Sequence, residues 1–235
     1  MPFSKDTPVK QRAVIVAGVR TPFVRAFGSL MTLDTIALGT AVTRVLLEKL
    51  GSAGTRIDGV LWGGAILPSA TPNVGREIVL DSGIAPTVEA TTLSRACTSG
   101  FIAATEAAAM IERGEADIMI AGGSDSTSNA EVKMPPSFVH KTAPVVMNAK
   151  SGVKDYFRLL FNLSVRKDLL PQRPSIRERT TGELMGEAAE RMARFWGITR
   201  EEQDEFAVQS HHRAAAAMAS GRLADEVLAV ELPNG

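Results

Sequence analysis

Apolar residues recur along the first half of the chain in two alternating spacings. Short runs rich in Val, Ile and Ala are typical of buried strands, whereas the longer segments place apolar residues three and four positions apart, as a half-buried helix does. Several helical segments end at a glycine, a common residue at the end of a helix. The pattern predicts strands at 13–18, 57–67, 90–96 and 116–123, and helices at 32–51, 73–83 and 98–114.

This alternation predicts the fold class of residues 13–123. Strands connected through helices lie parallel in one sheet, and the helices pack on its faces. We therefore expect a layered α/β domain with a largely parallel sheet.

The pattern changes after Gly123. Residues 124–150 are rich in Ser, Pro and Asn, which predicts irregular structure. Residues 153–170 then interleave aromatic residues and leucines with Lys and Arg, as in an amphipathic segment. Such a segment is more commonly a helix or helical hairpin packed on its own domain; the alternative is a face that binds a partner or a membrane surface. Exposure of Phe157, Leu160 and Phe161 would distinguish the two.

The last part of the chain is predicted to be helical up to Gly221. Helices are expected at 182–197 and 199–221, and the second begins with a capping box formed by Thr199 and Glu202. A further strand is expected at 224–233.

Composition and charge narrow the class of protein. The chain has 235 residues, 45% of them hydrophobic, and its 26 basic residues balance 26 acidic ones without forming a stripe. This argues against a nucleic-acid partner. The first apolar run has six residues, too short for a signal-peptide core, and no run approaches the roughly 20 residues that span a bilayer. A single cysteine forms no disulfide framework, which indicates a reducing, cytoplasmic setting.

That cysteine, Cys97, lies between a predicted strand and a predicted helix. The N–H groups of a helix's first turn are unpaired and favour an anion, so a thiolate is stabilised there. Thr98, Ser99 and Gly100 are small and leave room for a reacting carbon. A lone cysteine is nevertheless more often a small buried residue than a nucleophile. The local pattern leaves both interpretations open.

Several stretches, taken together, resemble the N-terminal half of the thiolases. The resemblance runs from residue 13 across nearly the whole chain, and it looks closest to the β-subunit type of the fatty-acid-oxidation trifunctional complex. The stretches that carry it are "AVIVAGVRTPFVRAFGSL", "PNVGREIVLDSGI", "SRACTSGFIAATEAAAMIERGEADIMIAGGSDSTS", "NLSVRKDLLPQRPSIRERTTGELMGEAAERMA" and "TREEQDEFAVQSHHRAAAAMASGRLADEV".

The resemblance implies a fold, a reaction and two site residues. Residues 1–123 would form a βαβαβαββ core half and 124–235 an inserted, mainly helical loop domain that covers coenzyme A and the acyl chain. Cys97 would be the acyl-accepting nucleophile in thiolytic cleavage of 3-ketoacyl-CoA, and Met185 would line the substrate pocket. Leu184 stands where short-chain thiolases have a histidine, so a polar contact to coenzyme A from that position is not expected.

The resemblance also implies partners. Coenzyme A enters as a substrate, and no cofactor or metal is expected. A homodimer or larger oligomer and a hydratase/dehydrogenase α-subunit are the partners that it implies. Membrane-surface contact by 153–170 stays the alternative that the amphipathic pattern leaves open.

Other thiolase motifs do not occur in this sequence. Thiolases stabilise the acetyl-CoA enolate with a histidine in a Gly-His-Pro motif and activate the incoming thiol with a second cysteine. The three histidines here are His140, His211 and His212, and there is no second cysteine. We expect a fragment or half enzyme, and the C-terminal core domain to be absent. The alternatives are a non-catalytic acyl-CoA- or partner-binding subunit and, less favoured, a ketoacyl synthase relative.

Overall fold

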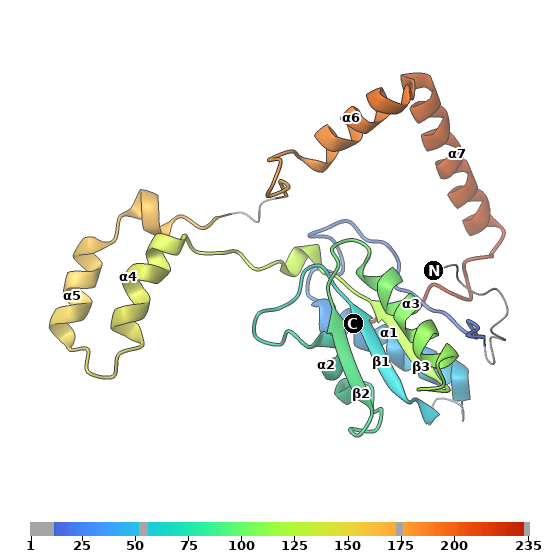
Figure 1. Ribbon diagram of the computed structural model, residues 1–235, viewed down its shortest axis with the longest axis horizontal. Coiled ribbons are helices and arrows are strands. Elements are labelled where there is room, and N and C mark those ends of the chain that lie inside the picture. Colours follow the sequence, from blue (N-terminus) through green and yellow to red (C-terminus); the bar gives the residue numbers. More distant parts are fainter. Residues whose placement is uncertain (1–11, 52–55, 173–175, 233–235) are drawn as a thin grey trace, which may run out of the picture. The chain divides into compact units, whose positions relative to one another are not determined.

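A computed structural model describes residues 12–51, 56–172 and 176–232 (Figure 1). The chain forms two compact units. The first comprises Met1–Ala130 together with His211–Gly235, and the second comprises Glu131–Ser210. The division into functional domains at residue 123 stays a prediction.

The first unit is built on a parallel sheet of three strands, as the alternating pattern predicts. The strands are β1 (Gly59–Gly63), β2 (Glu89–Leu93) and β3 (Met119–Gly123), in the spatial order β2-β1-β3. β1 is central and pairs with both neighbours along its whole length. The carboxyl ends of all three strands therefore meet at one edge of the sheet.

Helices cover both faces of this sheet (Figure 1). The helices of this unit are α1 (Thr35–Leu50), α2 (Val74–Asp81) and α3 (Ser99–Glu112). Right-handed crossovers from β1 to β2 and from β2 to β3 run in opposite directions, so α2 and α3 lie on opposite faces. α1 packs beside α2. The buried core consists of Ile57, Val60, Trp62, Val74, Ile78, Val79, Ile84 and Ile120.

Trp62 sets the spacing between the sheet and the helices on one face. Its ring fits because glycines stand around it: a Cβ atom on Gly39 would lie 2.9 Å from the ring, and one on Gly122 only 2.5 Å from it. The indole nitrogen donates a hydrogen bond to Ser124 Oγ over 2.9 Å. The buried indole therefore has a polar partner, as such groups require.

Two of the expected strands do not form. Residues 13–18 form no regular secondary structure, and the side chain of Ile15 is 94% exposed. In the described part of 224–233, only a bridge forms, between Arg20 and Val227. Both predictions are wrong in this structure. Apolar alternation reports which side chains favour burial, but a strand also needs a neighbour for its backbone hydrogen bonds.

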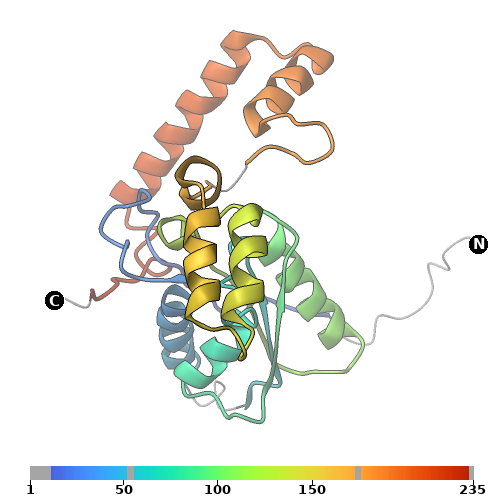
Figure 2. The same cartoon turned by 90° about the vertical axis from the view of Figure 1, so that its left-hand side faces the viewer.

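The second unit is helical. Its elements are α4 (Pro136–Val146), α5 (Val153–Asn162), the π-helical turn η3 (Val165–Leu169), α6 (Met185–Trp196) and the first half of α7 (Arg200–Ala219). α4 and α5 lie side by side as a hairpin in both views (Figures 1 and 2).

The irregular structure expected over 124–150 is wrong for α4. A short 3-10 turn, η2 (Thr127–Asn129), precedes this helix. Proline is acceptable at the first position of a helix because its missing N–H has no acceptor there, so Pro136 starts α4 rather than preventing it.

The helices expected at 182–197 and 199–221 are confirmed. The capping box is present: Glu202 N donates to Thr199 Oγ1 over 3.2 Å, and Thr199 N donates to the Glu202 carboxylate over 2.8 Å. Gly221 follows the helix with a positive φ of 72°.

An ion pair between α4 and η3, in which only the carboxylate is buried, joins the α4–α5 hairpin to the turn that follows it. Lys141 Nζ donates to Asp168 Oδ2 over 2.8 Å and to the Asn162 carbonyl over 2.9 Å, and Ser164 N donates to the same Asp168 oxygen. The Asp168 side chain is 1% exposed. The Lys141 ammonium, followed by the Ser137 hydroxyl and the Ser164 N–H, lowers the pKa of Asp168 below its ordinary range.

We predict that Asp168→Asn unfolds the hairpin more readily at neutral pH. The lowered pKa means that the carboxylate stabilises the fold above its ordinary pKa of about 4, and that this contribution is lost as the pH falls through the folded-state pKa. The wild type should therefore approach the variant in stability in acid. Thermal unfolding by circular dichroism at pH 7 and at a series of decreasing pH values below 4 measures both effects.

The matched control is Glu190→Gln, which breaks an exposed ion pair with Arg194. Such pairs contribute little, so its midpoint should stay near that of the wild type. Equal losses in the two variants would contradict a special role for Asp168.

Candidate functional site

Cys97 lies in the loop that joins the end of β2 to the start of α3. Its side chain is exposed, and Thr98 is the N-cap residue of α3. The buried interpretation of this lone cysteine is therefore wrong in this structure. The thiol stands at the carboxyl edge of the sheet, beside the positive end of a helix of 14 residues.

Hydrogen bonds from Ser99 hold the loop around Cys97. The Ser99 hydroxyl accepts from Arg95 N over 2.7 Å and donates to the Ala96 carbonyl over 2.6 Å. Thr98 Oγ1 donates to the Arg95 carbonyl over 2.8 Å. Ala96 has a φ of +49°, a conformation that costs an alanine energy and persists only where the surrounding contacts hold it. Cys97 is thus presented by a locally fixed turn.

Glycines let the start of α3 approach the strand ends. A Cβ atom on Gly63, the last residue of β1, would lie 2.4 Å from the Ser99 carbonyl carbon and 2.5 Å from Gly100 N. One on Gly123, the last residue of β3, would lie 2.8 Å from the Gly63 carbonyl oxygen. The backbones are therefore in direct contact, which fixes the height of Cys97 above the sheet.

Polar residues after β3 fix the neighbouring loops. The Asp125 carboxylate accepts from Ala65 N over 2.9 Å and from Ile66 N over 2.6 Å. Ser124 Oγ donates to the Thr35 carbonyl over 2.7 Å, which ties the end of β3 to the start of α1. These roles were not foreseen from the sequence, where "SDSTSN" indicated only a loop. The available signal was a run of short polar side chains directly after a strand ending in two glycines.

A separate cavity of about 420 Å³ lies beside β3. It is lined by residues 17–26, by one side of α1 and by residues 120–128, and Cys97 is not among its lining residues. Trp62 and Ile120 form part of its apolar wall. The cavity therefore lies at the β3 edge of the sheet and does not include the Cys97 thiol.

The other residues singled out from the sequence lie on helix surfaces. Met185 is the first residue of α6 in the second unit, and its side chain is 73% exposed. His140 lies exposed on α4, and His211 and His212 lie exposed on α7, as expected for a solvated helix face. Among the described residues, no group of three His, Cys, Asp or Glu side chains is placed to hold a metal ion. The roles of Cys97 and Met185 stay predictions.

Comparison with known proteins identifies the family. The model of the thiolase N-terminal domain matches residues 13–235, and the chain therefore belongs to the thiolase family. The layered α/β fold with its parallel sheet agrees with this membership. A solved acetyl-CoA acetyltransferase from Bacillus anthracis superposes with a TM-score of 0.73 at 26% identity, over 94% of this chain and 52% of that one.

Curated relatives carry the name 3-ketoacyl-CoA thiolase. The protein of Pectobacterium atrosepticum is 39% identical over 94% of this chain and 50% of its own length. That of Photorhabdus laumondii is 36% identical over 99% of this chain and 52% of its own length. The chain thus spans about half the length of the curated relatives that it matches.

We predict that Gly63→Ala destabilises the first unit by about 1–3 kcal/mol, because the added methyl group meets backbone atoms that have no room to move. Urea unfolding followed by circular dichroism measures the loss. Gly186→Ala is the matched control: it lies in α6 with no atom within 4 Å of the added Cβ. That variant should be neutral or slightly stabilised. Similar losses would contradict the close approach at Gly63.

We predict that Ser99→Ala costs about 0.5–1.5 kcal/mol, because the buried Ser99 hydroxyl loses its hydrogen bonds with Arg95 N and the Ala96 carbonyl. It should also change the rate at which iodoacetamide alkylates Cys97, since the loop loses two of its hydrogen bonds. Thr105→Ala is the control, as Thr105 is exposed on α3 and bonds only its own helix. An unchanged alkylation rate with Ser99→Ala would show that the loop keeps its conformation without this hydroxyl.

Proposed function

We propose that Cys97 accepts an acyl group during thiolytic cleavage of a 3-ketoacyl-CoA. The observation that carries this proposal is the position of the thiol: exposed, on a turn fixed by Ser99, at the start of α3 in a chain of the thiolase family. The names of the relatives and of the solved acetyltransferase supply the class of substrate. The same chemistry run backwards is a Claisen condensation.

The geometry suits a nucleophile that attacks a carbonyl carbon. The Cys97 thiolate would attack the 3-keto carbon, and the oxygen that becomes negative would lie near the Cys97 N–H, one donor of an oxyanion hole. The bond between C2 and C3 then breaks, its electron pair moves to the acetyl-CoA enolate, and that enolate takes up a proton. The thiol of a second coenzyme A attacks the thioester, releases the shortened acyl-CoA and restores Cys97.

Two steps of this cycle need groups that the present sequence does not supply. The enolate needs a stabilising donor and the incoming thiol needs a base, yet His140, His211 and His212 lie on exposed helix faces. Loss of one oxyanion donor alone typically lowers the rate by about 10²–10³. We therefore propose that this chain supplies the acyl-accepting half of the enzyme and that turnover requires a second half.

The substrate and partner assignments are part of the same proposal. Coenzyme A is a substrate, no cofactor is needed, and Met185 lines the acyl pocket. The protein forms a homodimer or larger oligomer, pairs with a hydratase/dehydrogenase α-subunit, contacts a membrane surface through 153–170, and works in the cytoplasm. The alternative is a non-catalytic subunit that binds acyl-CoA. The presence of a single cysteine and of histidines only on exposed helix faces favours this alternative, because a thiolase needs further catalytic groups.

Mass spectrometry of the chain after incubation with acetyl-CoA tests the proposal. We expect an increase by one acetyl group on Cys97, with free coenzyme A released, and no increase in Cys97→Ser. Steady-state thiolysis of acetoacetyl-CoA by the chain alone should be close to background.

The outcomes separate the alternatives. Acyl-CoA binding without any adduct would favour the non-catalytic subunit. Sustained thiolysis that depends on Cys97, without any added chain, would contradict the need for a second half.

A further inference from the structure

Two aspartates connect the ends of the central strand β1 to the ends of β3. At the amino end, Asp58 Oδ2 accepts from the N–H groups of residues 117–118 over 2.8 and 2.9 Å. At the carboxyl end, Asp125 Oδ1 accepts from the N–H groups of residues 65–66 over 2.9 and 2.6 Å. In both places one carboxylate oxygen binds two successive backbone N–H groups that flank the neighbouring strand.

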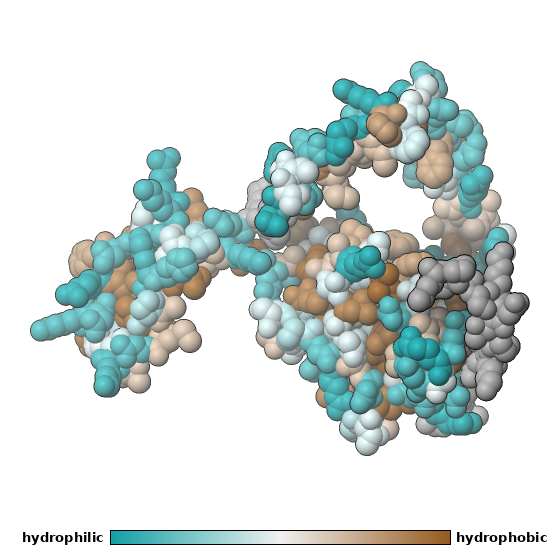
Figure 3. Space-filling model, in the orientation of Figure 1, coloured by the Kyte–Doolittle hydropathy of each residue, from teal (hydrophilic) through white to brown (hydrophobic). Residues whose placement is uncertain are grey.

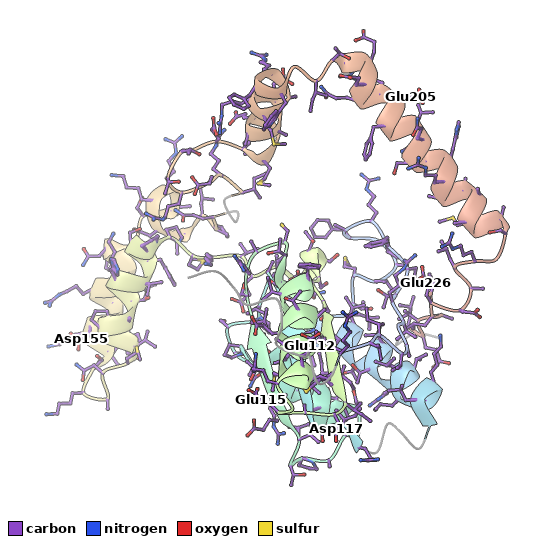
Figure 4. The ribbon with its side chains drawn as sticks, turned by 45° about the vertical axis from the view of Figure 1, so that its right-hand side comes forward. Glu112, Glu115, Asp117, Asp155, Glu205 and Glu226 are labelled. Carbon is purple, nitrogen blue, oxygen red and sulfur yellow. The ribbon has the colours of Figure 1, made fainter. Side chains whose placement is uncertain are left out.

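The candidate nucleophile lies at the Asp125 end of the sheet. Cys97 precedes α3 at the carboxyl edge, whereas Asp58 stands directly before β1 at the amino edge. Figure 4 shows Glu115 and Asp117 at this amino edge, where α3 has ended. The same kind of contact therefore occurs twice, once near the thiol and once at the opposite end of the strands.

The segment 64–66 supports the turn that carries Cys97. Gly64 N donates to the last carbonyl of β2 over 3.2 Å, and the Gly64 carbonyl oxygen lies 3.4 Å from Ser99 Oγ. The same hydroxyl group holds the turn before α3 through two shorter hydrogen bonds. A path of contacts therefore runs from the Asp125 carboxylate through this segment to Ser99 and the turn.

Asp125 holds the segment with a charged acceptor. Its side chain is exposed, and Figure 3 shows hydrophilic residues beside hydrophobic ones on the visible face of the first unit. Water therefore competes for the two N–H groups. An ionised carboxylate accepts shorter and stronger hydrogen bonds than a neutral oxygen does, and the 2.6 Å bond from Ile66 N agrees with this. The carboxylate thus keeps residues 64–66 in place at an edge that is open to solvent.

We infer that Asp125 is a positioning residue for the Cys97 thiol. It acts through other residues: it keeps residues 64–66 against Ser99, and Ser99 keeps the turn of Ala96 in the conformation that presents the thiol at the start of α3. The inference rests on the proposed acyl transfer and adds the residue that holds its nucleophile in place. Position matters for such a group, because a displacement of about 1 Å can lower a rate about a hundredfold.

Single-turnover acetylation of Cys97 by acetyl-CoA, followed on the full chain by quenched-flow mass spectrometry, tests the inference. Asp125→Ala removes the acceptor and should lower the rate constant at saturating acetyl-CoA by about ten- to a hundredfold. The acetyl-CoA concentration that gives half of the maximal rate should stay unchanged, because the contacts of the substrate are not altered. Asp125→Asn keeps an oxygen that can accept from both N–H groups, so it should recover most of the rate.

Asp58→Ala is the matched control, because it removes the same kind of contact between the same two strands at the opposite end. It should lower the unfolding temperature measured by circular dichroism, as Asp125→Ala does, yet become acetylated at the wild-type rate. If Asp125→Ala does not fold, Asp125→Glu takes its place: it keeps the charge, displaces the carboxylate by one methylene group and should be slowed as well.

Equal slowing in Asp58→Ala and Asp125→Ala would overturn the inference, since lost stability would then explain both. A wild-type rate in Asp125→Ala would overturn it too, as would a change confined to the acetyl-CoA concentration for half of the maximal rate.

The outcome is distinguishable from a failure of the proposed acyl transfer. If the wild type takes up no acetyl group, acyl transfer fails, and the rate of alkylation by iodoacetamide decides the positioning role. Asp125→Ala should then react more slowly than the wild type, because the thiol leaves the helix N-terminus that favours a thiolate. Asp58→Ala should react as fast as the wild type, and equal rates in all three proteins would contradict the positioning role.

Discussion

The close approach of the α3 N-terminus to the end of β1 determines the site of this protein. At Gly63 the strand backbone touches the backbone of Ser99 and Gly100, and no side chain fits between them. This contact brings the positive end of a helix to the carboxyl edge of a parallel sheet, where loops meet and ligands of α/β proteins commonly bind. Cys97 owes its position to that contact, because it is the second residue before the helix begins.

Polar residues in the loops at this edge hold the backbone around the strained residue Ala96. Ser99 serves the Cys97 loop, Asp125 serves residues 65 and 66, and Ser124 joins β3 to α1. Each of these side chains bonds a backbone N–H or carbonyl group that has no partner in a helix or strand. The positive φ of Ala96 is tolerated in this setting, and a conformation of that kind is common beside reactive groups.

The second unit follows a different physical rule. The hairpin helices α4 and α5 are short and bury no residue of their own, and the ion pair of Lys141 with the buried Asp168, rather than a large apolar core, ties α4 to η3. Any other packing of the hairpin would leave the Asp168 carboxylate buried without a cation beside it. The ion pair therefore favours the observed arrangement of α4 and η3. Phe157, Leu160 and Phe161 of α5 are exposed, so the hairpin leaves them uncovered among the described residues.

Much of this could be predicted from the sequence, because local signals control local structure. The parallel strands at 59–63, 89–93 and 119–123, the helices between them and the capping box of α7 all follow from apolar spacing and cap residues. The cysteine before an alanine-rich helix was visible as well. Family resemblance, not periodicity, distinguished Cys97 from a small core residue.

The tertiary structure decided what depends on neighbours distant in the sequence. The apolar segment at 13–18 did not form a strand, because a strand needs a neighbouring strand for its backbone hydrogen bonds and the segment's own sequence does not determine that neighbour. The roles of Gly63, Ser99 and Asp125 required knowing which backbones touch. By itself the sequence indicated most of the elements and the candidate nucleophile Cys97, through spacing and residue chemistry. The fold decided how the Cys97 thiol is held and which apolar surfaces stay exposed, because packing and hydrogen-bonding partners depend on segments that are distant in the sequence.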